Sequence, residues 1–141
     1  MATISFARGV PSADLLPVDE LRAAIARAME KDPTGMLLYG DPMGYMPLRT
    51  WVGERWGHDP AGVFVTNGSL QGFALLAEML FAGSGGRAVV EAPTYDRTIL
   101  TLKRFGATVD AIPLTEDGID VDRLEAQIAD GRVPGLVYII P

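Results

Sequence analysis

The sequence predicts an α/β fold, with a mostly parallel sheet and helices on both of its faces, preceded by an N-terminal arm and helices. Two observations support this prediction. From residue 61 onward, short apolar segments alternate with segments whose apolar residues recur at helical spacing. The last segment, 135–140, is a continuous apolar run, which is typical of a strand buried on both faces. We therefore divide the chain into a helical first part, 1–60, and an α/β part, 61–141.

The composition is that of an ordinary globular chain, and it limits the classes of function. Of the 141 residues, 48% are hydrophobic and 21% are charged, and the formal net charge is -6. The sequence has no basic run, which argues against nucleic acid and membranes as partners. It has no cysteine, which excludes thiolate chemistry, disulfides and cysteine-based zinc sites. No stretch approaches the roughly 20 apolar residues of a membrane span, so we expect a cytoplasmic protein.

Turn and helix signals divide the first part into five segments. They are an extended arm (1–17), a helix (18–31), a break at Asp32-Pro33-Thr34-Gly35, a loop (36–44) and a second helix (45–56). In the second helix, Leu48, Trp51 and Val52 lie on one face. Arg49 lies on the opposite face, together with other charged residues.

The second part alternates regularly between strand and helix signals. We expect strands at 62–66, 87–91, 107–113 and 135–140, and helices at 68–82, 95–105 and 120–129. In the middle helix, Ile99, Leu102 and Phe105 should point inward. The chain ends directly after the last strand, where a doubly wound sheet places a functional loop. We therefore expect this α/β domain to be incomplete.

The turn between strand 62–66 and helix 68–82 is the strongest candidate for a binding site. Asn67 is expected to cap the helix, while Gly68 and Ser69 keep its first turn free of bulky side chains. The first N–H groups of a helix have no internal partner and lie at the positive end of the helix dipole. The turn could therefore hold a phosphate group. An ordinary well-capped turn between strand and helix explains the same residues, and spacing alone does not decide between the two.

Three other segments should lie near this turn, at the carboxyl ends of the predicted strands. They are Glu91-Ala92-Pro93-Thr94-Tyr95, the loop Leu38-Tyr39-Gly40-Asp41-Pro42-Met43-Gly44 and the arm Gly9-Val10-Pro11. Tyr95 places an aromatic ring just beyond its strand. The remaining candidates are weaker. His58 has no Cys or second His beside it, so we expect no metal site, and Glu116, Asp117 and Asp120 are typical of a turn and a helix cap.

Four motifs occur in a fixed order along the chain. They are Phe6…Gly9-x-Pro11…Leu16-Pro17, Tyr39-Gly40-Asp41-Pro42-x-Gly44-x-x-x-Leu48-Arg49, Thr66-Asn67-Gly68-Ser69-x-Gln71 and Glu91-x-Pro93-x-Tyr95. Each motif is unspecific alone, but their order and spacing resemble the N-terminal part of fold-type I, pyridoxal-phosphate-dependent aminotransferases of class I and II. The likeness covers essentially the whole chain. It is greatest to the branch with 2-aminoadipate and aromatic or branched-chain aminotransferases, and it extends to the aminotransferase-like half of a class of bacterial regulators.

The resemblance implies a cofactor, pyridoxal 5′-phosphate, and a role for each matching residue. Gly68, Ser69 and Leu70 would hold the cofactor phosphate, with Gln71 beside them. The ring of Tyr95 would stack on the pyridine ring of the cofactor. Tyr39 would reach the phosphate of the neighbouring subunit in a homodimer. Gly9 and Val10 would line the substrate side of the site.

The resemblance also implies an activity, the transfer of an amino group from an amino acid to a 2-oxo acid in amino acid metabolism and biosynthesis. In that family an Asn-Pro-x-Gly motif and the Schiff-base lysine come later in the sequence, beyond Pro141. Lys31 is expected in the last turn of a surface helix, and Lys103 is expected to face solvent. We assign neither of them to the cofactor, so the 141 residues alone are expected to be inactive. Two alternatives remain open, a cofactor-binding effector domain of an aminotransferase-like regulator and a truncated product without function.

Overall fold

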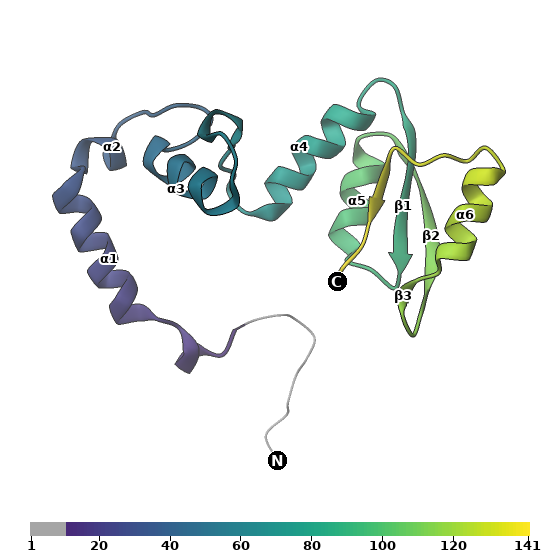
Figure 1. Ribbon diagram of the computed structural model, residues 1–141, viewed down its shortest axis with the longest axis horizontal. Helices are drawn as coiled ribbons and strands as arrows, with labels where there is room; N and C mark the ends of the chain where they lie inside the picture. Colours follow the sequence, from purple (N-terminus) through teal and green to yellow (C-terminus); the bar gives the residue numbers. More distant parts are fainter. Residues whose placement is uncertain (1–10) are drawn as a thin grey trace, which may run out of the picture. The chain divides into compact units, whose positions relative to one another are not determined.

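The computed structural model describes residues 11–141. They form two compact units, a first unit that ends at Val65 and a second unit, Thr66–Pro141. Figure 1 shows the elements of both units along the chain. None of the helices in the described range is long and apolar enough to cross a membrane.

The first unit is helical. Its elements are η1 (Ala13–Leu15), α1 (Val18–Lys31), α2 (Pro33–Leu37), α3 (Met46–Trp56) and η2 (Pro60–Gly62). The break predicted at 32–35 ends α1 but also begins α2, which the sequence analysis did not predict. The carboxylate of Asp32 accepts a hydrogen bond from the Gly35 N–H at 2.8 Å, and Pro33 occupies the first turn, where its missing N–H has no cost.

Arg49 is a buried charged residue of the first unit, although the sequence analysis placed it on the charged face of its helix. Only 3% of the residue is exposed. Its guanidinium donates to Asp41 Oδ2 at 3.1 Å and to the carbonyl oxygens of Pro60 and Ala61 at 3.2 and 3.4 Å. A guanidinium can be buried when its donors find acceptors. Arg49 therefore joins α3 to the loops on either side of it.

The strand predicted at 62–66 is absent, and this prediction was wrong. Residues 60–62 form the 3-10 turn η2, and the apolar residues that follow join no sheet in the described range. The Val65 N–H instead donates to the carbonyl oxygen of Met43 at 2.9 Å, within the first unit. An extended apolar segment becomes a strand only where a neighbouring strand accepts its hydrogen bonds.

The second unit confirms the predicted α/β fold. Its elements are α4 (Ser69–Phe81), β1 (Gly86–Ala92), α5 (Asp96–Arg104), β2 (Ala107–Thr115), β3 (Gly118–Ile119), α6 (Val121–Ala129) and β4 (Leu136–Tyr138). The strand order is β3-β2-β1-β4. β1 is parallel to β2 and to β4, and only the two-residue β3 runs antiparallel, against β2. The sheet is therefore mostly parallel.

Helices cover both faces of this sheet, as predicted. The chain crosses from β1 to β2 in one direction and from β2 back past β1 to β4 in the other. Because such crossovers are right-handed, the two connecting helices fall on opposite faces. α5 lies on one side of the sheet and α6 on the other (Figure 1).

The core of the second unit lies between the sheet and the helices α4 and α5. Its buried residues are Ala77, Phe81, Ala88, Val90, Leu102 and Ala107. Ile99 and Phe105 pack against this cluster beside Leu102, which confirms the predicted inner face of α5. Lys103 is exposed on that helix, as predicted.

The last strand differs from its prediction. β4 comprises only Leu136–Tyr138, and Val137, Ile139 and Ile140 are 43%, 53% and 51% exposed. β4 is an edge strand with one neighbour, β1, so the apolar run is not buried on both faces within the described residues.

Candidate functional site

The first turn of α4 presents free backbone N–H groups. The first hydrogen bond inside the helix runs from the Gly72 N–H to the Gly68 carbonyl oxygen, so the N–H groups of Ser69, Leu70 and Gln71 have no partner within the helix. Gly68 is the N-cap, with φ +84° and ψ 165°, a conformation that only glycine adopts readily. The turn is therefore bare because its backbone requires glycine.

Asn67 does not cap α4, and that prediction was wrong. No side chain caps the helix, because the N-cap position is occupied by Gly68. The N–H of Asn67 instead donates to Gln71 Oε1 at 2.6 Å. Gln71 thereby fixes the segment before the helix, and the positive end of the helix dipole stays open.

Ser69 and Tyr95 line one pocket of about 110 Å³. We call it the Ser69–Tyr95 pocket; its lining residues are Ser69, Leu70, Phe73, Tyr95, Thr98 and Tyr138. Ser69 begins α4, and Tyr95 is the N-cap residue of α5. The turn and the aromatic residue that the sequence placed beyond two strands thus share a hollow at the start of two helices.

Three residues of this pocket, Phe73, Thr98 and Tyr138, were missed in the sequence analysis. Thr98 lies one turn after Tyr95 on α5, and Tyr138 ends β4. The ring of Tyr138 packs edge-on against Phe73, with ring centroids 5.3 Å apart. The helical spacing from Tyr95 could have indicated Thr98. Tyr138 depends on the pairing of β4 with β1, which no local pattern shows.

The turn before Tyr95 contains an unsatisfied polar atom. The hydroxyl oxygen of Thr94 is buried and makes no hydrogen bond within residues 11–141. Such an atom costs about 1–3 kcal/mol. A polar group supplied from outside these residues would remove that cost.

Other predicted site residues lie elsewhere. Gln71 lines a separate hollow between α4 and α5, together with Asn67 and Arg104. Tyr39 belongs to the first unit, on the segment between α2 and α3, and its side chain is fully exposed. Gly9 and Val10 lie outside the described residues.

Arg49 organises the loop that follows Tyr39. Its partner Asp41 also accepts a hydrogen bond from the Met43 N–H at 2.7 Å. Gly44 has φ +108°, and a Cβ there would lie 2.6 Å from the Cβ of Val65. The loop therefore requires glycine at position 44, and Arg49 holds it through Asp41.

A tyrosine–aspartate contact ties the start of α3 to the start of α2. The hydroxyl of Tyr45 donates to Asp32 Oδ2 at 2.7 Å. This bond, followed by the Gly35 N–H, holds the pKa of Asp32 below its ordinary value. The same bond raises the pKa of Tyr45, because it favours the protonated phenol.

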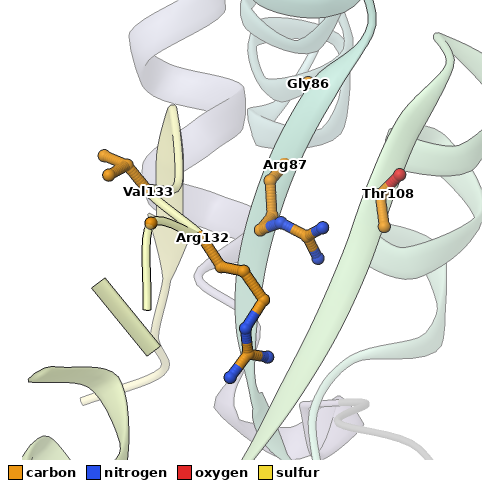
Figure 2. A pocket seen from close by; sticks show the side chains of 6 residues that line it. Gly86, Arg87, Thr108, Arg132 and Val133 are labelled. Carbon is orange, nitrogen blue, oxygen red and sulfur yellow. The ribbon is translucent and has the colours of Figure 1, made fainter. Parts of the chain in front are cut away.

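A second pocket, of about 360 Å³, lies at the amino end of the sheet (Figure 2). Arg87, at the start of β1, and Arg132, after α6, both line it. Each arginine already has an acidic partner: Arg87 Nη1 lies 2.6 Å from Asp110 Oδ2, and Arg132 Nη2 lies 3.3 Å from Asp130 Oδ2. The charges of the four side chains cancel, so this pocket lacks the positive excess of a phosphate site.

The likeness to known proteins extends over nearly the whole chain. A family model for class I and II aminotransferases matches residues 3–139. The chain belongs to this family. The chain is 35% identical to the 2-aminoadipate transaminase of Thermus thermophilus, over 98% of its own length and 34% of the relative. It is 32% identical to the aromatic-amino-acid aminotransferase 1 of Thermococcus litoralis, over 98% of its own length and 35% of the relative.

Solved structures of aminotransferases are also similar to this chain. The α-aminoadipate aminotransferase LysN of Thermus thermophilus, in complex with N-(5′-phosphopyridoxyl)-L-leucine, superposes with a TM-score of 0.84 and 34% identity. The match covers 96% of this chain and 34% of LysN. The chain thus spans about a third of the length of these relatives. A transcriptional regulator of Bacillus subtilis, YcxD, is less similar, with 25% identity over 86% of the chain, so the regulator is the weaker of the predicted alternatives.

Proposed function

We propose that this chain is the N-terminal segment of a pyridoxal-phosphate-dependent aminotransferase that moves an amino group from an amino acid to a 2-oxo acid. The observation that carries the proposal is the shared pocket of Ser69 and Tyr95, at the free N–H groups of α4. Family membership supports it, and the LysN structure holds a phosphopyridoxyl compound.

The described residues fit a phosphorylated ring cofactor. In the proposed site the N–H groups of Ser69 and Leu70 and the Ser69 hydroxyl hold the phosphate. Gly68 keeps that approach open, and Gln71 holds the segment before it. Charge-assisted hydrogen bonds of this kind are about twice as strong as neutral ones. The buried Thr94 hydroxyl gives the same region a polar group that lacks a partner in the described chain.

Tyr95 supplies the aromatic surface of the proposed site. It is half exposed and lines the pocket, so part of its surface is available to the cofactor ring. Stacking fixes the plane of the ring relative to the phosphate at α4. Tyr95 and Ser69 together would therefore set the position and the orientation of the cofactor.

When bound, pyridoxal phosphate supplies the electron sink that lets an amino acid lose its α-proton and give up its amino group. The described residues contribute binding and orientation. Lys31 ends α1, and Lys103 is exposed on α5; neither lines the Ser69–Tyr95 pocket. The proposal accordingly takes the cofactor lysine from outside the described residues.

Three finer points belong to the same proposal. The active form is a homodimer, and the exposed Tyr39 of one subunit reaches the phosphate site of the other. Gly9 and Val10 line the substrate side. The enzyme acts in the cytoplasm, in the biosynthesis of amino acids.

The test is transfer of isotope by the polypeptide that the gene encodes in full. The protein is incubated with pyridoxal phosphate, a ¹⁵N-labelled amino acid and an unlabelled 2-oxo acid, and mass spectrometry follows the label. We expect ¹⁵N in the amino acid that corresponds to the added 2-oxo acid. Absence of transfer across a panel of amino acids, together with absence of cofactor binding, would refute the proposal.

A further inference from the structure

The strand order of the sheet reverses between β1 and β4. The chain leaves β1 for β2 on one side and later returns to β4 on the other. In open α/β sheets, ligands bind outside the carboxyl ends of the strands at such a point. The residues at the carboxyl ends of β1 and β4 therefore matter for the site.

Glu91 is a buried carboxylate at this end of β1. The residue is 5% exposed, and its Oε1 accepts a hydrogen bond from the Ile140 N–H at 2.9 Å. The ladder between the two strands ends earlier, at the pair Val90 and Tyr138. Beyond that pair a side chain, and not the backbone of β1, holds the chain that follows β4.

The contact between Glu91 and Ile140 fixes the main chain after β4 to the end of β1. A carboxylate that accepts a backbone N–H forms a charge-assisted hydrogen bond, which is stronger than a neutral ladder bond. Burial of a carboxylate is costly unless it is hydrogen-bonded, and the Ile140 N–H supplies a hydrogen bond to Glu91. The contact joins residues that lie far apart in the sequence.

We propose that Glu91 is a positioning residue for the cofactor site, because it sets where the main chain leaves the sheet after β4. β1 continues into the turn that carries Tyr95, and Tyr138 lies two residues before Ile140. Both tyrosines line the Ser69–Tyr95 pocket. One carboxylate thus holds together the two strand ends from which these rings project. The inference rests on the proposed function.

The test uses the complete gene product loaded with pyridoxal phosphate. Two readouts are followed, hydrogen exchange of the Ile140 amide and the rate at which the cofactor dissociates. Glu91→Ala removes the acceptor, and we expect both rates to rise about tenfold. Glu91→Gln keeps an acceptor oxygen, and we expect both rates to stay within about threefold of those of the wild type.

Val89→Ala is the matched control. Val89 is fully buried in the same strand, and its side chain has no atom that could accept a hydrogen bond from Ile140, so its truncation lowers the melting temperature without removing the Glu91 contact. We expect Val89→Ala to leave both rates near those of the wild type. If Glu91→Ala does not fold, Glu91→Asp replaces it, since the shorter side chain keeps the charge but loses the reach to Ile140.

The outcomes separate the two claims. If Glu91→Ala leaves both rates unchanged, or Val89→Ala raises them equally, the positioning role of Glu91 is overturned. If the wild type binds no pyridoxal phosphate, the proposed function fails. The exchange rate of the Ile140 amide in Glu91→Ala, compared with the wild type, then still decides whether Glu91 fixes the main chain after β4.

Discussion

Ser69 and Tyr95 line the same small pocket, although they come from the starts of two different helices. The parallel strand β1 makes this possible, because it carries the chain from the end of α4 back to the edge at which α4 begins. A helix N-terminus and an aromatic ring meet there. The contribution of each residue to cofactor binding can be measured with the complete gene product.

Removal of the Ser69 hydroxyl should weaken cofactor binding. In Ser69→Ala one hydrogen bond to a charged phosphate is lost while the backbone N–H groups remain. We expect the dissociation constant for pyridoxal phosphate to rise about tenfold. The measurement is a fluorescence titration with the cofactor. Ser84→Ala, in the exposed turn before β1, is the control and should bind as the wild type does. Equal affinity of Ser69→Ala and Ser84→Ala would contradict the phosphate role.

Tyr95 should act through its ring and not through its hydroxyl. Tyr95→Phe keeps the aromatic surface, so we expect affinity for the cofactor close to that of the wild type. Tyr95→Ala removes the stacking, which is worth about 0.5–1.5 kcal/mol, and should weaken binding roughly two- to tenfold. Calorimetric titration of the three proteins measures both effects. A loss in Tyr95→Phe as large as that in Tyr95→Ala would show that the hydroxyl is the contributing group.

The buried Arg49 should be among the most sensitive positions of the first unit. Arg49→Ala leaves Asp41 and the carbonyl oxygens of Pro60 and Ala61 without their donor. We expect the free energy of unfolding to fall by about 2–4 kcal/mol. Hydrogen exchange of the backbone amides of α3, followed by mass spectrometry along a urea series of the complete gene product, reports on this unit.

The control for this position is Arg27→Ala, at an exposed arginine of α1. An exposed substitution without a specific contact changes stability by at most about 0.5 kcal/mol. An equal effect of the two substitutions would mean that the hydrogen bonds of Arg49 are not what stabilises the loop after Tyr39.

Tyr45 should control the titration of Asp32. The Tyr45 bond lowers the pKa of Asp32 in the folded protein, so its contribution to stability is present above the ordinary aspartate pKa, about 4. It is lost as the pH falls through the lowered value. At the alkaline end the raised pKa of Tyr45 has the opposite sign, and its contribution is lost as the pH rises above about 10.

Tyr45→Phe removes both effects. We expect the midpoint of Asp32, followed by NMR of its carboxyl carbon, to rise toward the ordinary value. Tyr39→Phe is the control, because Tyr39 is fully exposed and makes no hydrogen bond to Asp32. An unchanged midpoint in Tyr45→Phe would exclude this bond as the cause of the lowered pKa.

Much of the fold follows from local patterns in the sequence. The apolar spacing of Ile99, Leu102 and Phe105 predicts both the existence of α5 and its inner face, because residues three and four apart lie on one side of any helix. The alternation of such helices with short apolar segments predicts the mostly parallel sheet. The order of four motifs predicts the family, and with it the pairing of Ser69 with Tyr95.

Other features depend on which segments meet in space. Residues 62–66 have the composition of a strand but find no strand to pair with among residues 11–141. Arg49 was predicted on a charged helix face, yet it is buried because acceptors from two loops surround it. Tyr138 reaches the pocket, and Glu91 meets the Ile140 N–H, through the pairing of β4 with β1. Spacing along a chain determines which side chains share a face, whereas the partner of a hydrogen bond between distant residues is set only when the sheet and loops assemble.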